Sequence, residues 1–194
     1  EERRRKELHT SIAAGGGDVD DYLRSLQMVL SLGLDDASQV KRLAQLTQKT
    51  NQFNLTTRRY TEDQIQAFIE SDDWRVLHFS LADIFGNSGV VGLALWHKVS
   101  PERAELDSFL MSCRVIGRQA ESAFLNAQLS FLAEQGIRDV VGDYQPTAKN
   151  LLVATFLPDH GFLLQDATGR YHRNLREHPP IPEDRFPLSI CWQR

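Results

Sequence analysis

The chain has 194 residues, of which 41% are hydrophobic and 25% charged, a composition typical of a globular protein with one compact domain and a short appendage. Its formal net charge of −4 excludes the global positive field of a nucleic-acid-binding protein. No apolar run approaches the roughly 20 residues that cross a bilayer, and the N-terminus is charged and lacks an apolar signal segment. We expect a cytoplasmic protein that binds neither nucleic acid nor membrane.

The cysteines and histidines give no metal-binding pattern. Cys113 and Cys191 have no metal-ligand spacing and cannot define a disulfide framework, which fits a reducing compartment. The six histidines are scattered, and no two stand four residues apart on one predicted helix. The sequence therefore indicates no zinc or iron site.

The N-terminal quarter of the chain predicts helices. A charged helical run ends in a triple glycine, which predicts a flexible linker, and a chain that opens this way is expected to be cut from a longer protein. Asp20 or Asp21 should cap a helix that runs through Leu30, with Gly33 near its end, and Asp36 should cap a second helix. We divide the chain into a lead-in, a helical extension and a main domain, at residues 1–19, 20–48 and 49–194.

The main domain alternates predicted strands and helices. Thr61 and Gln64 form a capping box before a helix, and Gly136 should end a later, strongly apolar helix. Three antiparallel strands, a turn into a helix, then a strand, a helix and two closing strands give an α+β fold with one mixed, mostly antiparallel sheet flanked by helices. The strands are expected at 74–82, 89–99, 103–111, 137–144, from 161 and at 187–192, and the last helix at 147–160.

The stretch from Ser112 to Glu121 joins the third expected strand to the apolar helix. Its Arg-x-x-Gly turn would place free backbone N–H groups at the positive end of the helix dipole, where phosphate oxygens bind. We interpret it as a diphosphate cradle, with glycine capping of an ordinary helix as the alternative. The residues assigned to the cradle are Arg114, Val115, Ile116, Gly117, Arg118, Gln119 and Ala120.

Residues 45–60 are nearly free of aliphatic side chains and dense in amide and hydroxyl groups. Such a segment is either a solvated loop or the wall of a polar pocket. The absence of glycine and proline favours the pocket wall. If residues 54–58 form a strand, Asn54, Thr56 and Arg58 lie on one face of it.

The cradle and the segment that follows it resemble the GNAT superfamily of acyltransferases. The acyl-CoA motif of that superfamily is Gln/Arg-x-x-Gly-x-Gly/Ala, which Arg114 and Gly117 match, whereas Gln119 stands at the second small-residue position. Asn150 matches an asparagine that contacts pantetheine in the next motif. Leu157 stands where the superfamily often has a tyrosine general acid, and a leucine cannot donate a proton.

Residues 45–60, 109–117 and 144–150 more specifically resemble the C-terminal half of FkbH-like proteins, in a similarity that covers residues 20–165. The resemblance implies a GNAT-like domain that moves a glyceryl unit from 1,3-bisphosphoglycerate to the phosphopantetheine thiol of an acyl carrier protein in polyketide biosynthesis. It also implies an upstream haloacid-dehalogenase-like domain. The chain itself has no haloacid-dehalogenase motif, so we expect an excised domain or a divergent relative.

Cys113 is the predicted acyl-bearing nucleophile of this transfer. A thiolate attacks thioesters and leaves again at similar energy, and helix N–H groups and Arg114 would stabilise both the thiolate and the oxyanion. The alternative is a buried small residue that ends a strand, which is the commoner fate of cysteine. Cys191, on the last strand, is assigned to the core.

The remaining candidates are polar residues placed around this thiol. His160 could be a general base near the pantetheine, or a histidine that caps the last helix carbonyls. Lys149 and Arg118 could hold the phosphate of the arm. The residues that could hold glyceryl hydroxyls are Asn51, Asn54, Thr56 and Arg58.

Two other functions stay open. An acetyl-CoA-dependent N-acetyltransferase would have the same fold, although Leu157 counts against it. A catalytically inactive module that only binds the carrier arm is the second alternative.

Overall fold

The computed structural model of the protein describes residues 2–14 and 18–193. Within these residues, nine strands form one sheet in the order β7-β8-β6-β5-β4-β3-β1-β9, and β2 pairs with β5 off this path. All pairs are antiparallel except β1 with β9 and β5 with β6. The strands are β1 (Met28–Leu34), β2 (Phe53–Asn54), β3 (Trp74–Asp83), β4 (Gly86–Ser100), β5 (Arg103–Met111), β6 (Asp139–Asp143), β7 (Leu163–Leu164), β8 (Arg170–Asn174) and β9 (Leu188–Trp192).

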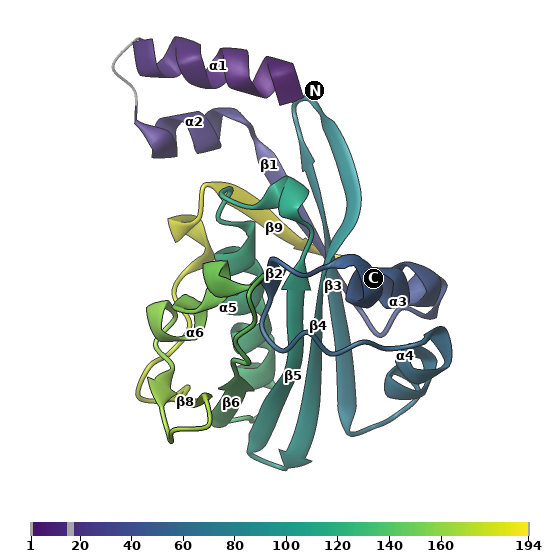
Figure 1. Cartoon of the computed structure of the whole chain (residues 1–194). Helices are drawn as coiled ribbons and strands as arrows, with labels where there is room; N and C mark the ends of the chain where they lie inside the picture. Colours follow the sequence, from purple (N-terminus) through teal and green to yellow (C-terminus); the bar gives the residue numbers. More distant parts are fainter. Residues whose placement is uncertain (1, 15–17, 194) are drawn as a thin grey trace.

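Helices cover both faces of this sheet, with α3 and α4 on one face and α5 and α6 on the other (Figure 1). The arrangement confirms the predicted α+β fold with a mixed, mostly antiparallel sheet. None of the helices in the described ranges is long and apolar enough to cross a membrane. The helices are α1 (Glu2–Ala14), α2 (Val19–Ser25), α3 (Val40–Lys49), α4 (Glu62–Ile69), α5 (Ala120–Glu134) and α6 (Phe156–Asp159), with 3₁₀ turns η1 (Ala37–Gln39), η2 (Cys113–Val115), η3 (Leu151–Val153) and η4 (Glu183–Arg185).

The central strands bury both faces because successive side chains point to opposite sides of a sheet. On β5, Phe109 and Met111 pack on the side of α5, whereas Leu110 packs under α3 and α4. Trp96 of β4 is buried and donates its Nε1–H to Gln128 Oε1 of α5 at 2.6 Å. This hydrogen bond satisfies the indole and fixes α5 against the sheet.

Two predicted helix boundaries are confirmed. The capping box of Thr61 and Gln64 begins α4, with each side chain accepting the other residue's backbone N–H. Gly136 follows α5 with a φ of +86°, a conformation that glycine adopts without strain. Asp36 also accepts the N–H of Ser38, as a cap of η1, which leads into α3.

The helix predicted to run through Leu30 is wrong beyond Ser25. Asp18, and not Asp20 or Asp21, caps α2, and residues 28–34 form β1. Met28, Leu30 and Leu32 are buried while Val29 is exposed, which is a period of two and not of 3.6. The triple glycine of the predicted linker lies outside the described residues.

The helix predicted over 147–160 is also wrong. Asn150 Oδ1 accepts the N–H of Thr147, so a side chain competes with the helical hydrogen-bond pattern. Pro158 has no N–H for the carbonyl one turn earlier and fits only in the first turn of the short α6. The prediction also missed β8, whose polar sequence Arg-Tyr-His-Arg-Asn carries little apolar alternation.

The chain closes the gap between β5 and β6 with its own backbone. These parallel strands pair over four residues each, and the segment 53–55 then lies between their continuations. On one side, Phe53 pairs with Met111 of β5. On the other, Gln145 N–H donates to Leu55 O at 2.9 Å. The segment therefore fills the space between the two strands next to the end of β5.

Candidate functional site

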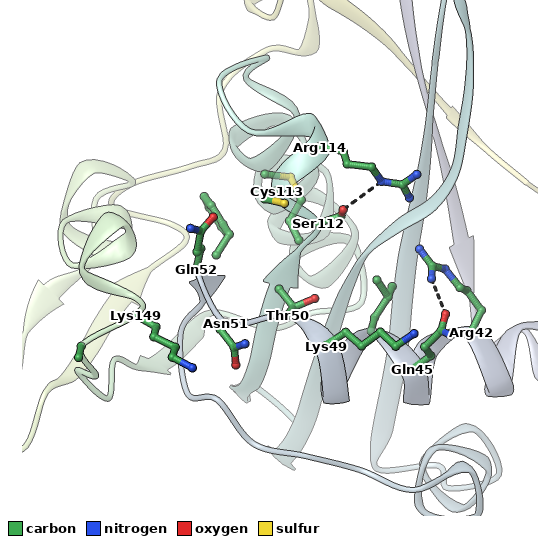
Figure 2. A pocket seen from close by; sticks show the side chains of 14 residues that line it. Arg42, Gln45, Lys49, Thr50, Asn51, Gln52, Ser112, Cys113, Arg114 and Lys149 are labelled. Atoms are coloured by element: carbon green, nitrogen blue, oxygen red, sulfur yellow. Dashed lines mark hydrogen bonds between the residues drawn. The ribbon is translucent and has the colours of Figure 1, made fainter. Parts of the chain in front are cut away.

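A cavity of about 760 Å³ opens at the carboxyl end of β5 (Figure 2). Three apolar side chains, Leu46, Phe53 and Met111, contribute to its lining. The rest comes mainly from polar residues of α3, of the segment after α3, of the turn after β5 and of the loop after β6. We call it the Cys113 cavity, defined by its lining residues Arg42, Gln45, Leu46, Lys49, Thr50, Asn51, Gln52, Phe53, Met111, Ser112, Cys113, Arg114, Ala148 and Lys149.

Cys113 is a free and exposed cysteine in η2, two residues beyond the end of β5. Ser112 N–H donates to Val91 O at 2.7 Å, which anchors the start of this turn to β4. Figure 2 shows Cys113 between Gln52 and Ser112 at the cavity. The thiol is therefore open to a ligand in the cavity, and the alternative of a buried residue that ends a strand is excluded.

Cys191 does not belong to the core, contrary to the prediction. It is exposed on β9, and its Sγ lies 3.2 Å from Ser31 Oγ of β1. β9 is the last strand at one edge of the sheet, and of its residues only Leu188 is buried. The edge position exposes a strand that its apolar sequence alone would place in the core.

Of the four predicted substrate-binding residues, Asn51 lines the Cys113 cavity and the other three do not. Asn54 and Thr56 are buried, and Thr56 Oγ1 donates to Asp107 O at 3.0 Å. The strand expected over 54–58 is not formed beyond Asn54, since Thr57 has a φ of +54° and its N–H donates to Asn54 Oδ1. The shared face predicted from strand alternation is therefore wrong.

Arg58 is held in place by Asp107, a partly buried residue of β5. Its guanidinium forms an ion pair with the Asp107 carboxylate, whose other oxygen accepts the hydroxyl of Tyr60 at 2.7 Å. Burial, together with this hydrogen bond to a carboxylate, raises the pKa of Tyr60 far above its ordinary value. Arg58, Tyr60 and Asp107 thus fasten the polar segment to the sheet.

The predicted cradle has the backbone shape of an anion site. Gly117 and Gln119 have φ values of +80° and +60°, and a side-chain carbon added at Gly117 would meet no atom within 4 Å. Among the described residues, no acceptor pairs with the backbone N–H groups of 117–120. Val115 and Ala120 are buried and Ile116 packs against the core, so these residues offer a ligand only their backbone.

Arg118 and Lys149, which were both predicted to hold the phosphate of the arm, differ in their surroundings. Arg118 donates to Asp83 Oδ2 at 3.3 Å and to Arg114 O at 3.1 Å, and burial lowers its pKa. Its guanidinium is therefore already engaged by the protein. Lys149, in contrast, lines the Cys113 cavity and is exposed.

His160 lies in another cavity, of about 450 Å³, so the structure does not bring it together with Cys113. Its Nδ1 is 2.6 Å from Phe156 O and can only donate to that carbonyl, so Nε2 accepts from Ser122 Oγ at 2.9 Å. Burial lowers the pKa of His160 and keeps the ring neutral. The structure therefore shows His160 as a histidine that caps a carbonyl at the end of α6.

Asn150 is a buried structural residue. Its Nδ2 donates to Asn54 O at 2.8 Å and to Gln145 O at 3.0 Å, while its Oδ1 accepts from Thr147. It therefore joins the loop after β6 to the segment that closes the sheet. Leu157 is also buried.

The start of the segment predicted as a pocket wall, residues 45–53, lines the Cys113 cavity, but the sequence analysis missed Arg42 of α3. Arg42, Gln45 and Lys49 all line the Cys113 cavity, and Arg42 Nη1 donates to Gln45 Oε1 at 2.6 Å. Their spacing of three and four residues places them on one face of a helix. This polar stripe was visible in the sequence, but only the fold shows which strand end it faces.

Comparison with solved structures identifies the fold. The chain is similar to Ard1 from Thermoplasma volcanium (18% identity, 75% of this chain and 97% of that one, TM-score 0.55) and to a GNAT-family protein from Desulfovibrio desulfuricans (11%, 75% and 99%, 0.56). It is also similar to Rv2747 from Mycobacterium tuberculosis, solved with CoA (14%, 68% and 70%, 0.53). No protein-family model matches the sequence, and the search of curated proteins also finds no match.

The predicted GNAT-like fold is thereby confirmed. Within the described residues, no group of three or more histidine, cysteine, aspartate and glutamate side chains is arranged to hold a metal ion.

Proposed function

We propose that this chain is an acyltransferase that moves a small acyl group through a thioester on Cys113 to the phosphopantetheine thiol of an acyl carrier protein. One observation carries the proposal: the free thiol of Cys113 is exposed at a cavity directly after β5. The GNAT fold supports it, since a solved neighbour with this fold holds CoA, which contains the same pantetheine arm. The resemblance to FkbH-like proteins suggests a three-carbon, glyceryl-type acyl group and polyketide biosynthesis.

The transfer has two balanced steps. The Cys113 thiolate attacks the acyl carbonyl, a C–S bond forms, and the donor's phosphate or thiol leaves with the bonding electron pair. The carrier thiolate then attacks the enzyme thioester, and Cys113 leaves as a thiolate. Arg114 and Ser112 flank the sulfur in sequence and line the same cavity, so they are the groups best placed to polarise the carbonyl.

The residues present fit the phosphate of a pantetheine arm at one place. The backbone N–H groups at 117–120, which have no acceptor among the described residues, and the open space in front of Gly117 suit an anion. The space between β5 and β6 is closed by residues 53–55, so the arm would reach Cys113 along the outer surface. An upstream haloacid-dehalogenase-like domain or a neighbouring synthase module would supply the acyl group.

An acetyl-CoA-dependent N-acetyltransferase is the second candidate, because proteins of this fold include N-acetyltransferases. The buried Leu157 offers no proton to a leaving thiolate, which favours the cysteine route. A carrier-binding module without catalysis is the third.

Intact-protein mass spectrometry tests the proposal. The chain is mixed with its acyl donor, the enzyme domain that supplies it and a holo acyl carrier protein, and acyl adducts are followed on both proteins. We expect Cys113→Ala to lower the loading rate at least about 10³-fold, because no other group forms the thioester. Cys191→Ala, which removes the other exposed thiol, is the matched control and should load normally.

Unchanged loading by Cys113→Ala would rule out the cysteine route. Acetylation of a free amine from acetyl-CoA, with the carrier left unmodified, would establish the second candidate. Tight carrier binding without any adduct would establish the third.

A further inference from the structure

We infer that Ser122 and His160 form a second reactive site, at which Ser122 accepts a short acyl group from a carboxylic ester and water then releases it. The two side chains face one cavity of about 450 Å³, whose lining residues all differ from those of the Cys113 cavity. The inference goes beyond the proposed acyl transfer and does not depend on it.

Ser122 and His160 are a nucleophile and a base in hydrogen-bond contact. Ser122 Oγ lies 2.9 Å from His160 Nε2, although the two residues are 38 positions apart in the sequence. Ser122 belongs to the first turn of α5, and His160 directly follows α6. A serine hydroxyl is a weak nucleophile until an adjacent base takes its proton, and this distance is within the range that such a proton transfer requires.

The ring of His160 is held in the tautomer that a base needs. Phe156 O can only accept, so Nδ1, at 2.6 Å from it, carries the proton, and the lone pair of Nε2 faces the serine hydroxyl. Burial lowers the pKa of His160, so the ring is neutral and free to accept a proton near neutral pH. The carbonyl at Nδ1 thus takes the place that a carboxylate has in a Ser-His-Asp triad.

Arg173 brings a buried positive charge to the same cavity. Its side chain is 8% exposed, and among residues 2–14 and 18–193 it forms no ion pair with a carboxylate. Its guanidinium donates instead to backbone oxygens, of His160 at 2.6 Å, His178 at 3.0 Å and Pro179 at 2.9 Å. A guanidinium has five N–H donors and these bonds use three, so two remain to stabilise the negative oxygen that forms when a carbonyl is attacked.

The rest of the lining favours an apolar acyl group. Four apolar side chains contribute to it, namely Leu125, Leu129, Ile181 and Phe186. The volume of about 450 Å³ is near the lower end of the range of small-molecule pockets, which suits an acyl chain of a few carbons. The substrate class is therefore a small ester of a short aliphatic acid.

The reaction has two balanced steps. Ser122 Oγ forms a bond to the ester carbonyl carbon, its proton passes to His160 Nε2, and the alcohol takes that proton as the C–O bond of the ester breaks. Water then attacks the acyl-serine and gives a proton to Nε2, and the Ser122 oxygen takes this proton as it leaves. The net reaction is hydrolysis of the ester to a carboxylic acid and an alcohol.

Labelling with an alkyl fluorophosphonate, followed by peptide mass spectrometry, tests the site. Attack of a serine oxygen on phosphorus expels fluoride and leaves a stable phosphonate ester, which locates the nucleophile in the wild-type chain. We expect the adduct on Ser122, and we expect Ser122→Ala and His160→Asn to slow labelling at least about 100-fold. Asparagine keeps an N–H for Phe156 O but removes the base, so this variant separates the cap from the base.

Ser130→Ala is the matched control. Ser130 is a partly exposed serine of the same helix that lines another cavity, so its variant should label normally. Hydrolysis of p-nitrophenyl acetate and p-nitrophenyl butyrate gives a second measurement. We expect the butyrate to react faster, because its longer chain buries more apolar surface.

Three results would overturn the inference. No adduct, or equal adducts on Ser122 and Ser130, would mean that Ser122 is not activated. Unchanged labelling of His160→Asn would leave His160 as a helix cap alone. Ester hydrolysis that survives in Ser122→Ala and is lost in Cys113→Ala would assign the activity to the thiol.

Discussion

His78 of β3 is buried, and in the described part of the chain neither of its ring nitrogens has a hydrogen-bond partner. Its ring lies over Gly33 of β1, where any added side-chain carbon would collide with it. The nearest charge is Asp36, with Oδ2 at 3.7 Å from Nε2. Burial lowers the pKa of His78 despite the attraction of Asp36, so the folded state keeps the ring neutral.

The pH dependence of stability follows from this lowered pKa. Because the folded value lies below the unfolded value of 6.5, the neutral ring contributes stability above that pH, and the contribution is lost as pH falls. His78→Phe keeps a ring over Gly33 and removes both unpartnered nitrogens. We expect it to raise the free energy of unfolding by about 1 kcal/mol near pH 8 and by more near pH 5.

Urea unfolding at the two pH values measures the effect. A gain that is the same at both would show that His78 does not titrate between the folded and unfolded states. A loss at both would show that the phenyl ring does not fit the imidazole site.

Residue identity predicted part of the site. Cys113 and Arg114, which line the cavity, were selected from their position between a strand and a helix, which is a local property. Asn54 and Thr56 were assigned to the substrate because amides and hydroxyls suit a polyol, but their partners are backbone groups of this chain. A polar side chain has the same chemistry in either role, so sequence alone does not separate them.

At the scale of elements, the short strand β2 has only two residues, but it connects β5 to α6. Phe53 packs edge-on against Phe156 with ring centroids 5.3 Å apart and lies 6.1 Å from the ring of Phe109. It thereby joins α6 to the end of β5. Phe53 also lines the Cys113 cavity, so the packing of this segment shapes the site.

Phe53→Ala should therefore lower the free energy of unfolding by about 3–5 kcal/mol, since it leaves a hole between three elements. Gln52→Ala is the control, because Gln52 is the exposed neighbour on the same segment. Denaturant unfolding of both variants measures the difference. Equal stability of the two variants would mean that β2 is not part of the cooperative core.

Elements with strong periodicity or clear caps were predicted well, as α4, α5 and β3 to β5 show. The wrong predictions have a common cause, because in both segments specific contacts, and not the local apolar pattern, decide the backbone conformation. Residues 28–34 are apolar enough for a helix or a strand, and the neighbours β3 and β9 decide between the two. Residues 147–160 have helical composition, but the side chain of Asn150 and the ring of Pro158 interrupt the backbone pattern.

At the scale of the whole molecule, Asp83 connects three parts of the chain that are distant in sequence. Its carboxylate accepts Arg5 Nε–H at 2.8 Å and Arg118 Nη1–H at 3.3 Å, from α1 and from the cradle. It also accepts the N–H of Phe85 in the β3–β4 turn at 2.9 Å. Figure 1 shows α1 beside the tip of this long hairpin.

Asp83→Asn should uncouple these parts. Burial alone would raise the pKa of Asp83, but the hydrogen bonds from Arg5 and Phe85 and the charge of Arg118 lower it overall. Stability from this carboxylate is thus present above pH 3.8 and lost as pH falls below it. Asp83→Asn removes the negative charge from a buried ion pair with Arg5 and Arg118, at a cost of about 3–5 kcal/mol.

Limited proteolysis measures this effect. We expect Asp83→Asn to be cleaved within α1 faster than the wild-type chain, because the Arg5 contact is weakened. Asp159→Asn, which changes an exposed carboxylate at the end of α6, is the control. Equal cleavage of all three proteins would show that α1 is held by other contacts.

The arrangement of the two exposed thiols has a practical consequence for spectroscopy. Cys113 lies among four cations and Cys191 at the edge of the sheet, so the sign of a reagent's charge can sort them. An anionic electrophile would accumulate at Cys113 and leave Cys191 for a neutral maleimide added afterwards. Two different dyes can thus be attached to the natural sequence, and the distance between them would report whether the chain moves when the proposed acyl carrier protein is added.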